Sequence, residues 1–67
     1  MADVLSDMVH ASQVTILHVE DDPTTRYVIG RILHHEGFTL REAATGAEGL
    51  RLVKERPDLV ILDVQLP

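Results

Sequence analysis

The chain has 67 residues and a formal net charge of −5, with six Lys and Arg against eleven Asp and Glu. This length allows one domain, which buries only about 60% of its unfolded surface and is marginally stable. The chain has no cysteine, which excludes disulfides and thiolate metal sites. The few basic and aromatic residues form no patch, so we expect no direct contact with nucleic acid. No run of about 18 apolar residues is present, so we expect a cytoplasmic protein without a membrane span.

The chain begins with a short segment that we expect to lie outside the folded domain. Residues 1–13 are too few for a stable isolated helix, so they predict a flexible leader. Residues 14–19 predict the first strand, because β-branched residues dominate them and no breaker intervenes. Asp22 followed by Pro23 is typical of a helix start. Gly37 then supplies the left-handed residue that often ends a helix.

The middle of the chain predicts a second strand and a second helix. Residues 38–44 are more polar than the first strand, which favours an edge position in a sheet. Thr45 and Glu48 have the spacing of a capping box, and Pro57 ends the helix that follows. The apolar positions of both helices are expected to form core against the sheet: Val28, Ile29, Ile32 and Leu33 in the first, and Ala47, Leu50 and Val53 in the second.

The last predicted strand, residues 59–62, is a run of four apolar residues, which is typical of a strand buried on both faces. Strands and helices therefore alternate along the chain. This alternation predicts an α/β fold with a doubly wound parallel sheet and right-handed crossovers. Because the polar second strand belongs at an edge, the predicted spatial order of the strands is 2-1-3.

Acidic residues gather at the carboxyl end of this predicted sheet. Ligands of open parallel sheets bind where the strand order reverses, here between the first and third strands. Glu20 and Asp21 follow the first strand, and Asp63 follows the third. These carboxylates would repel one another and raise at least one pKa unless a cation joined them. Mg²⁺ favours such oxygen ligands, and an Asp beside Mg²⁺ can attack phosphorus to form an aspartyl phosphate.

Several separated stretches resemble the receiver domain of two-component response regulators, which has a flavodoxin-like fold. They are residues 16–23, the Gly37-Phe38 turn, residues 42–46 and residues 58–67. The resemblance covers residues 14–67. It implies that Asp63 is the phosphoacceptor and takes its phosphoryl group from a histidine kinase or a histidine phosphotransfer protein. It also implies that Mg²⁺ is bound by Glu20, Asp21, Asp63 and the backbone carbonyl of Gln65.

A receiver has five strands and five helices, so the resemblance implies that residues 14–67 are the N-terminal portion, truncated after the third strand. The other half of a receiver carries a Ser or Thr and a Lys that contact the phosphoryl oxygens. Lys54 cannot replace that Lys, because it lies late in a helix antiparallel to the strands, at the pole opposite Asp63. We therefore expect a phosphoacceptor that is not an enzyme and holds no stable phosphoryl group. A hybrid histidine kinase is one candidate for the parent chain.

Two other functions stay open. A non-catalytic pseudo-receiver fragment that acts by protein contact fits an incomplete site. A phosphohydrolase of the haloacid-dehalogenase type also uses a strand-end Asp beside Mg²⁺, but it needs a second Asp where Gln65 stands. An exposed apolar third strand would also favour self-association. Among the histidines, His18 is expected to be a hydrogen-bonded core residue, and the adjacent His34 and His35 to form a solvated helix end.

Overall fold

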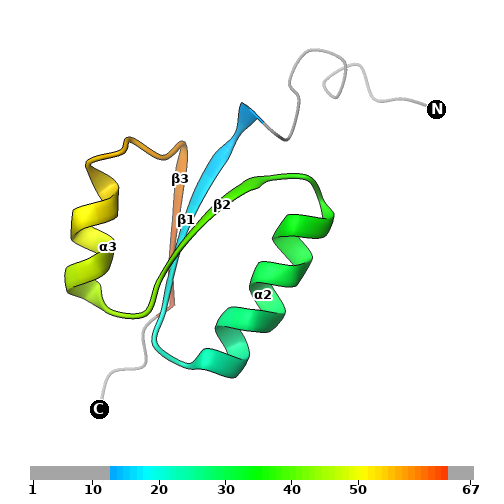
Figure 1. The fold of residues 1–67 in the computed structure, drawn as a ribbon, viewed down its shortest axis with the longest axis horizontal. Helices are drawn as coiled ribbons and strands as arrows, with labels where there is room; N and C mark the ends of the chain where they lie inside the picture. The colour runs from blue at the N-terminus through cyan, green and yellow to red at the C-terminus, as the bar shows by residue number, and fades with distance from the viewer. Residues whose placement is uncertain (1–12, 64–67) are drawn as a thin grey trace.

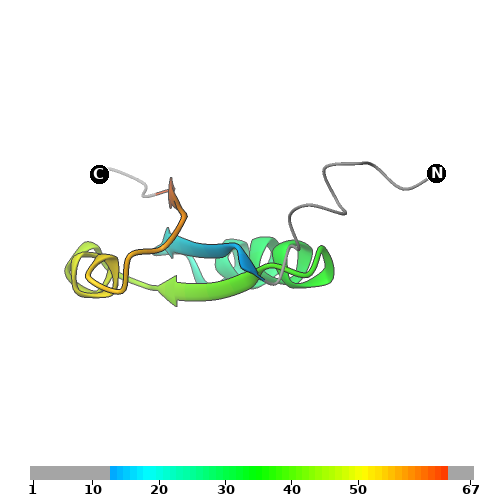
Figure 2. The same cartoon turned by 90° about the horizontal axis from the view of Figure 1, so that it is seen from above.

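The structure, a computed structural model, describes residues 13–63. Its elements follow one another as β1 (Thr15–Glu20), α2 (Pro23–His35), β2 (Thr39–Ala43), α3 (Gly46–Val53) and β3 (Leu59–Asp63). The three strands form one parallel sheet in the order β2-β1-β3 (Figures 1 and 2). The predicted α/β fold and strand order are thus confirmed. The predicted leader lies outside the described residues except for Gln13, and its flexibility stays a prediction.

The two helices lie on opposite faces of the sheet (Figure 1). This follows from the handedness of the connections: β1 to β2 runs in one direction across the sheet, and β2 to β3 runs back in the other. Both helices pack against β1 and β2. The central strand β1 is therefore covered on both sides, and β3 lies at the edge beyond the helices. Within residues 13–63, neither helix is long and apolar enough to cross a membrane.

The predicted helix starts and the Gly37 turn are confirmed in atomic detail. The second helix ends at Val53, four residues before the predicted stop at Pro57. The Asp22 carboxylate accepts hydrogen bonds from the backbone N–H of Thr25 (2.8 Å) and from its hydroxyl (2.7 Å), which caps α2. Gly37 follows α2 with φ 92°, a conformation that glycine adopts without steric cost. The Thr45 hydroxyl accepts a hydrogen bond from the Glu48 N–H (3.1 Å) and caps α3. These caps fix where each helix begins relative to the carboxyl ends of the strands.

The core is narrow and centred on β1. The fully buried apolar side chains are Ile16, Leu17 and Val19 of β1 and Ala43 of β2, and Leu52 of α3 packs against this cluster. His18 is buried as predicted, but its expected hydrogen bonding is wrong. Neither ring nitrogen of His18 has a hydrogen-bond partner among the residues that the structure describes.

Two predictions of burial are wrong. Strand β3 is not covered on both faces, because Leu59, Val60 and Leu62 are 51%, 45% and 69% exposed. The predicted core stripes of the helices are also largely exposed at Val28, Ile32, Leu50 and Val53. Both results have one cause, which is that the helices lie over β1 and β2. Strand β3 is therefore left uncovered, and the narrow sheet covers only part of the apolar face of each helix.

Candidate functional site

The site is built where β1 and β3 end side by side. The two strands run parallel, and Glu20 is the register partner of Asp63. Neighbouring strands lie about 4.8 Å apart, and register partners direct their side chains to the same face. The convergence of the two strand ends that the sequence predicted is therefore present. Asp21 follows Glu20 directly in the turn that leads to α2.

Glu20 is the buried member of this cluster. Its side chain is only 2% exposed, whereas Asp21 and Asp63 are exposed. One Glu20 carboxylate oxygen accepts a hydrogen bond from the Asp22 N–H (3.1 Å). The Glu20 backbone carbonyl accepts a hydrogen bond from Arg26 Nη1 (2.9 Å). Both the side chain and the main chain of Glu20 are thus held in place by the β1–α2 turn.

The pKa of Glu20 reflects the other carboxylates near it. The hydrogen bond from the Asp22 N–H lowers the pKa of Glu20, but opposing causes outweigh it and the net pKa is raised above its usual value. Those causes are burial, the neighbouring Asp21 carboxyl, and the negative charge of Asp63. Ionised Glu20 is therefore destabilised by its surroundings, which is the condition that a bound cation would relieve.

Asp22 has a different role from its two acidic neighbours, as predicted. The Thr25 hydroxyl, then the Thr25 N–H, lower the pKa of Asp22, and Arg26 adds a favourable charge. Its carboxylate is engaged in capping α2. Sequence reasoning missed Arg26, which joins the end of β1 to the first turn of α2. The sequence does contain a signal for this contact. A basic residue that follows an acidic loop by about four positions can reach back to the end of the strand.

The side chains at the acidic strand ends offer oxygen donors to a metal ion. Across residues 13–63, no group of three or more His, Cys, Asp or Glu side chains is arranged to hold one. Mg²⁺ often takes only one or two carboxylates and completes its coordination with water, so the oxygen chemistry of Glu20, Asp21 and Asp63 fits it. Gln65 lies outside the described residues. The ligand set Glu20, Asp21, Asp63 and the Gln65 carbonyl stays a prediction.

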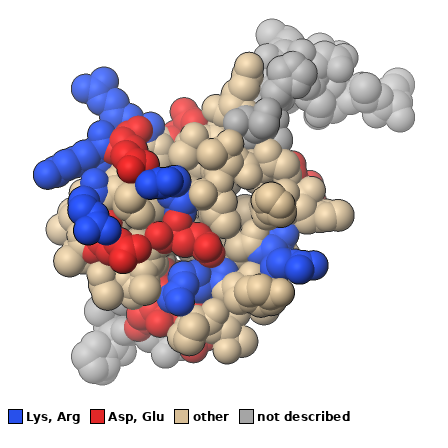
Figure 3. All heavy atoms as spheres, in the orientation of Figure 1, with Lys and Arg blue, Asp and Glu red and all other residues tan. Residues whose placement is uncertain are grey.

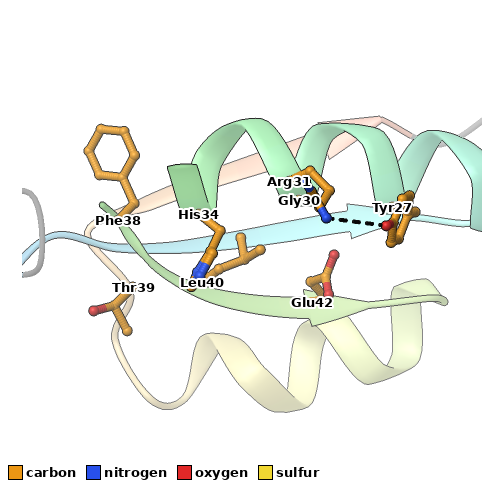
Figure 4. A pocket seen from close by; sticks show the side chains of 8 residues that line it. All are labelled: Tyr27, Gly30, Arg31, His34, Phe38, Thr39, Leu40 and Glu42. Carbon is orange, nitrogen blue, oxygen red and sulfur yellow. Dashed lines mark hydrogen bonds between the residues drawn. The ribbon is translucent and has the colours of Figure 1, made fainter. Parts of the chain in front are cut away.

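A hollow of about 540 Å³ lies elsewhere, between α2 and β2 (Figure 4). Arg31 lies over the Tyr27 ring, 5.9 Å from its centroid, and its Nη1 is 3.5 Å from the Tyr27 hydroxyl. The only carboxylate in its lining is Glu42. The hollow therefore lacks the paired acids that distinguish the carboxyl end of β1 and β3.

Charge elsewhere on the described surface is mixed. In Figure 3, basic and acidic side chains lie next to one another on the face shown. One salt bridge is present within the described part of the chain, from Arg41 to Glu55 at 3.0 Å, and both side chains are about half exposed. Such surface pairs contribute little to stability. The paired carboxylates at the strand ends therefore differ from the mixed charges on the rest of the described surface.

Comparison with known proteins places this arrangement in a family. The profile of the response regulator receiver domain matches residues 16–67. The chain is 43% identical to Transcriptional regulatory protein AfsQ1 of Streptomyces coelicolor over 54 residues, 79% of this chain and 24% of that protein. It is 42% identical to Sporulation initiation phosphotransferase F of Bacillus subtilis over 53 residues, 78% of this chain and 43% of that protein.

A third relative is the Sensor histidine kinase CheAY of Helicobacter pylori, which is 36% identical over 59 residues, 84% of this chain and 7% of that protein. The chain thus spans less than half the length of each of these relatives. The profile match nevertheless covers the β1-α2-β2-α3-β3 unit from Ile16 onward, including both acidic strand ends. This chain belongs to the response regulator receiver domain family.

Proposed function

We propose that this chain accepts a phosphoryl group on the carboxylate of Asp63 from a phosphohistidine of a histidine kinase or histidine phosphotransfer protein. The observation that carries the proposal is the pairing of exposed Asp63 with buried Glu20 at adjacent strand ends. The family match supports it, and so do the names of two relatives, a phosphotransferase and a sensor histidine kinase. In this proposal the chain is a cytoplasmic phosphoacceptor and not an enzyme.

The chemistry is a transfer between two nucleophiles. A carboxylate oxygen of Asp63 attacks phosphorus and forms an O–P bond, while the P–N bond to the donor imidazole breaks and its electron pair returns to the ring nitrogen. Asp63 suits this role because it is exposed at the end of a strand, where a donor can reach it. Mg²⁺, bound by Glu20, Asp21, Asp63 and the Gln65 carbonyl, would neutralise charge on the phosphoryl oxygens.

The remaining residues position the acids. The Asp22 N–H fixes the Glu20 carboxylate, and Arg26 fixes the Glu20 carbonyl. Because Asp22 itself is engaged by Thr25, the turn that carries Glu20 and Asp21 is anchored to the capped start of α2. These contacts lower the entropic cost of ordering the turn when a cation binds.

The phosphoryl group is expected to be short-lived on this chain. Within the described residues, the one cationic side chain that contacts the acidic turn is Arg26, and its hydrogen bond goes to the Glu20 carbonyl. No Lys or Arg there forms a salt bridge with Asp63. An acyl phosphate without a cationic side chain beside it loses the charge stabilisation that such a group would give.

The test traps the product before it hydrolyses. The chain is incubated with Mg²⁺ and phosphoramidate, a small donor with a P–N bond, and is then reduced with borohydride, which converts an aspartyl phosphate to homoserine. Mass spectrometry of peptides should find homoserine at position 63, and none in Asp63→Asn or when EDTA replaces Mg²⁺. Homoserine at another Asp, or none in the wild type, would refute the proposal, and a phosphoryl group that persists for hours would refute the expected short lifetime.

A non-catalytic role in protein contact is the second candidate. It is favoured by the apolar surface that α3 and β3 leave uncovered, where Leu50 and Leu62 are 74% and 69% exposed. The same trapping experiment separates the two functions, because a pure binding module would show no modification at Asp63. The family match favours both of these over a haloacid-dehalogenase type of phosphohydrolase.

A further inference from the structure

The hollow between α2 and β2 is polar at one end and apolar at the other. The side chains of Tyr27, Arg31 and Glu42 lie at one end, and those of Leu40 and Phe38 lie towards the other (Figure 4). Its volume of about 540 Å³ falls within the range of about 300–1,000 Å³ that is usual for small-molecule sites. This division along its length suits a ligand with a polar head and an apolar tail.

One face of α2 forms a wall of the hollow. Tyr27, Gly30, Arg31 and His34 follow one another at helical spacing, so they share this face. Gly30 lets the helix approach β2 closely, because a Cβ there would lie 2.7 Å from Glu42 Oε2. The Glu42 carboxylate therefore lies directly against the backbone of α2, at the polar end of the hollow.

The Glu42 carboxylate is an acceptor that no group occupies. Among the residues that the structure describes, no hydrogen bond or salt bridge engages it. Its side chain points from β2 towards α2 (Figure 4), and the residue is exposed, so a ligand can reach it. A carboxylate that lies against protein on one side gains from a cationic partner on the other. An ammonium group in the hollow would supply that partner.

The Arg31 guanidinium offers the opposite charge at the same end. It lies over the Tyr27 ring, 5.9 Å from the centroid, and its Nη1 is 3.5 Å from the Tyr27 hydroxyl. Stacking on the ring orients the guanidinium, whose other N–H groups contact no acid in the part of the chain that the structure describes. A planar guanidinium with free N–H groups binds a carboxylate through two parallel hydrogen bonds. Arg31 is therefore prepared for a carboxylate ligand.

We propose that the hollow between α2 and β2 binds a free α-amino acid with an apolar side chain. The ligand carboxylate binds Arg31, the ligand ammonium binds Glu42, and the apolar side chain packs along Leu40 and Phe38, which are half-buried. A ligand with a single charge fits less well, because an anion meets Glu42 and a cation meets Arg31. The proposal does not rest on the phosphoacceptor function, since Asp63 does not line the hollow.

The exposure of the polar end sets the strength of binding. Tyr27, Arg31 and Glu42 are exposed, so water and salt screen the two ion pairs that the ligand forms. Each exposed ion pair contributes about 0.2–1 kcal/mol, and the apolar side chain adds the burial of a few methylene and methyl groups. We therefore expect reversible binding in the millimolar range.

The test removes one ligand charge at a time. The ¹⁵N-labelled chain is titrated with L-leucine, and ¹H–¹⁵N NMR follows the amides of Gly30, Arg31, Leu40 and Glu42, which should shift and saturate at millimolar leucine. Leucinamide lacks the carboxylate, and N-acetyl-leucine lacks the ammonium. Each should bind about three- to fivefold more weakly than leucine, the range for the loss of one exposed ion pair.

Matched variants assign each ligand charge to its residue. Arg31→Gln should bind leucine and leucinamide equally, and Glu42→Gln should bind leucine and N-acetyl-leucine equally. Lys54→Gln removes a cation outside the hollow and should keep both preferences. The absence of saturable shifts with leucine, or equal binding of the three ligands by the wild type, would overturn the proposal. So would either preference surviving in the variant that should abolish it. The three titrations of the wild type decide the question if a variant fails to fold.

Discussion

At the scale of single residues, Glu20 is the buried carboxylate at the ends of the strands. A carboxylate that is 2% exposed has lost most of its hydration, and burying a charge is costly unless partners compensate. Its hydrogen bond from the Asp22 N–H compensates in part, but Asp21 and Asp63 act in the opposite direction. The residue is therefore held in a position that stability alone does not favour.

The first prediction concerns Glu20→Gln in EDTA. Because the pKa of Glu20 is raised in the folded state, its contribution to stability is full below its usual pKa and is lost as pH rises through the folded pKa. The glutamine carbonyl can still accept the Asp22 N–H. Urea unfolding should therefore show the variant to be more stable than the wild type at pH 7, and this advantage should shrink towards pH 4. A variant that is less stable at pH 7 would contradict this account of Glu20.

Asp22 gives a second prediction with the opposite pH dependence. Its pKa is lowered in the folded state by Thr25, so the stability it contributes is present above its usual pKa and is lost as pH falls through the folded pKa. Asp22→Ala should lower the unfolding free energy at pH 7, because the helix loses its cap. Asp22→Asn is the matched control, since it keeps an oxygen acceptor, and it should cost less. Equal losses in both variants would show that the cap is not the cause.

At the scale of elements, the position of α3 depends on a close approach between Gly49 and β1. A Cβ at Gly49 would lie 2.8 Å from Val19 Cγ2, which is closer than packed atoms tolerate. The helix can therefore rest directly on the central strand only because this residue has no side chain. This contact helps to place Val19 in the core one residue before Glu20.

The third prediction follows from that contact. Gly49→Ala should destabilise the fold by about 1 kcal/mol, because the cost of overpacking exceeds the gain in helix propensity. Gly46→Ala is the matched control in the same helix, since a Cβ there meets nothing within 4 Å. That variant should be neutral or slightly stabilised. Thermal unfolding by circular dichroism measures both, and a Gly49→Ala variant as stable as Gly46→Ala would show that α3 can shift without cost.

At the scale of the whole molecule, the sequence predicted the order of the strands and both helix starts, because these depend on local signals. Asp22 with Pro23 and Thr45 with Glu48 are read within a few residues of chain. The approach of Glu20 to Asp63 was also predictable, because parallel strands bring their carboxyl ends to one edge of the sheet. Residue pattern and topology were sufficient for these features.

Burial was less predictable, because it depends on what packs beyond an element. The run of four apolar residues in β3 is typical of a covered strand, yet the helices that could cover it lie over β1 and β2. The same reason leaves Leu50 exposed while Gly49 faces the core. His18 was expected to have a hydrogen-bond partner. Its register partners on the neighbouring strands are Ile61 and Glu42, and neither forms a hydrogen bond with its ring.

The central proposal is that a cation binds at the carboxylates of Glu20, Asp21 and Asp63. A Mg²⁺ titration followed by ¹H–¹⁵N NMR tests it most directly, with Ca²⁺-free buffer and with Asp63→Asn as the control. We predict saturable shifts at millimolar Mg²⁺ in the amides of residues 20–22 and 63, and a weaker response in the variant. An unchanged spectrum at these amides, or an identical response in Asp63→Asn, would contradict the claim.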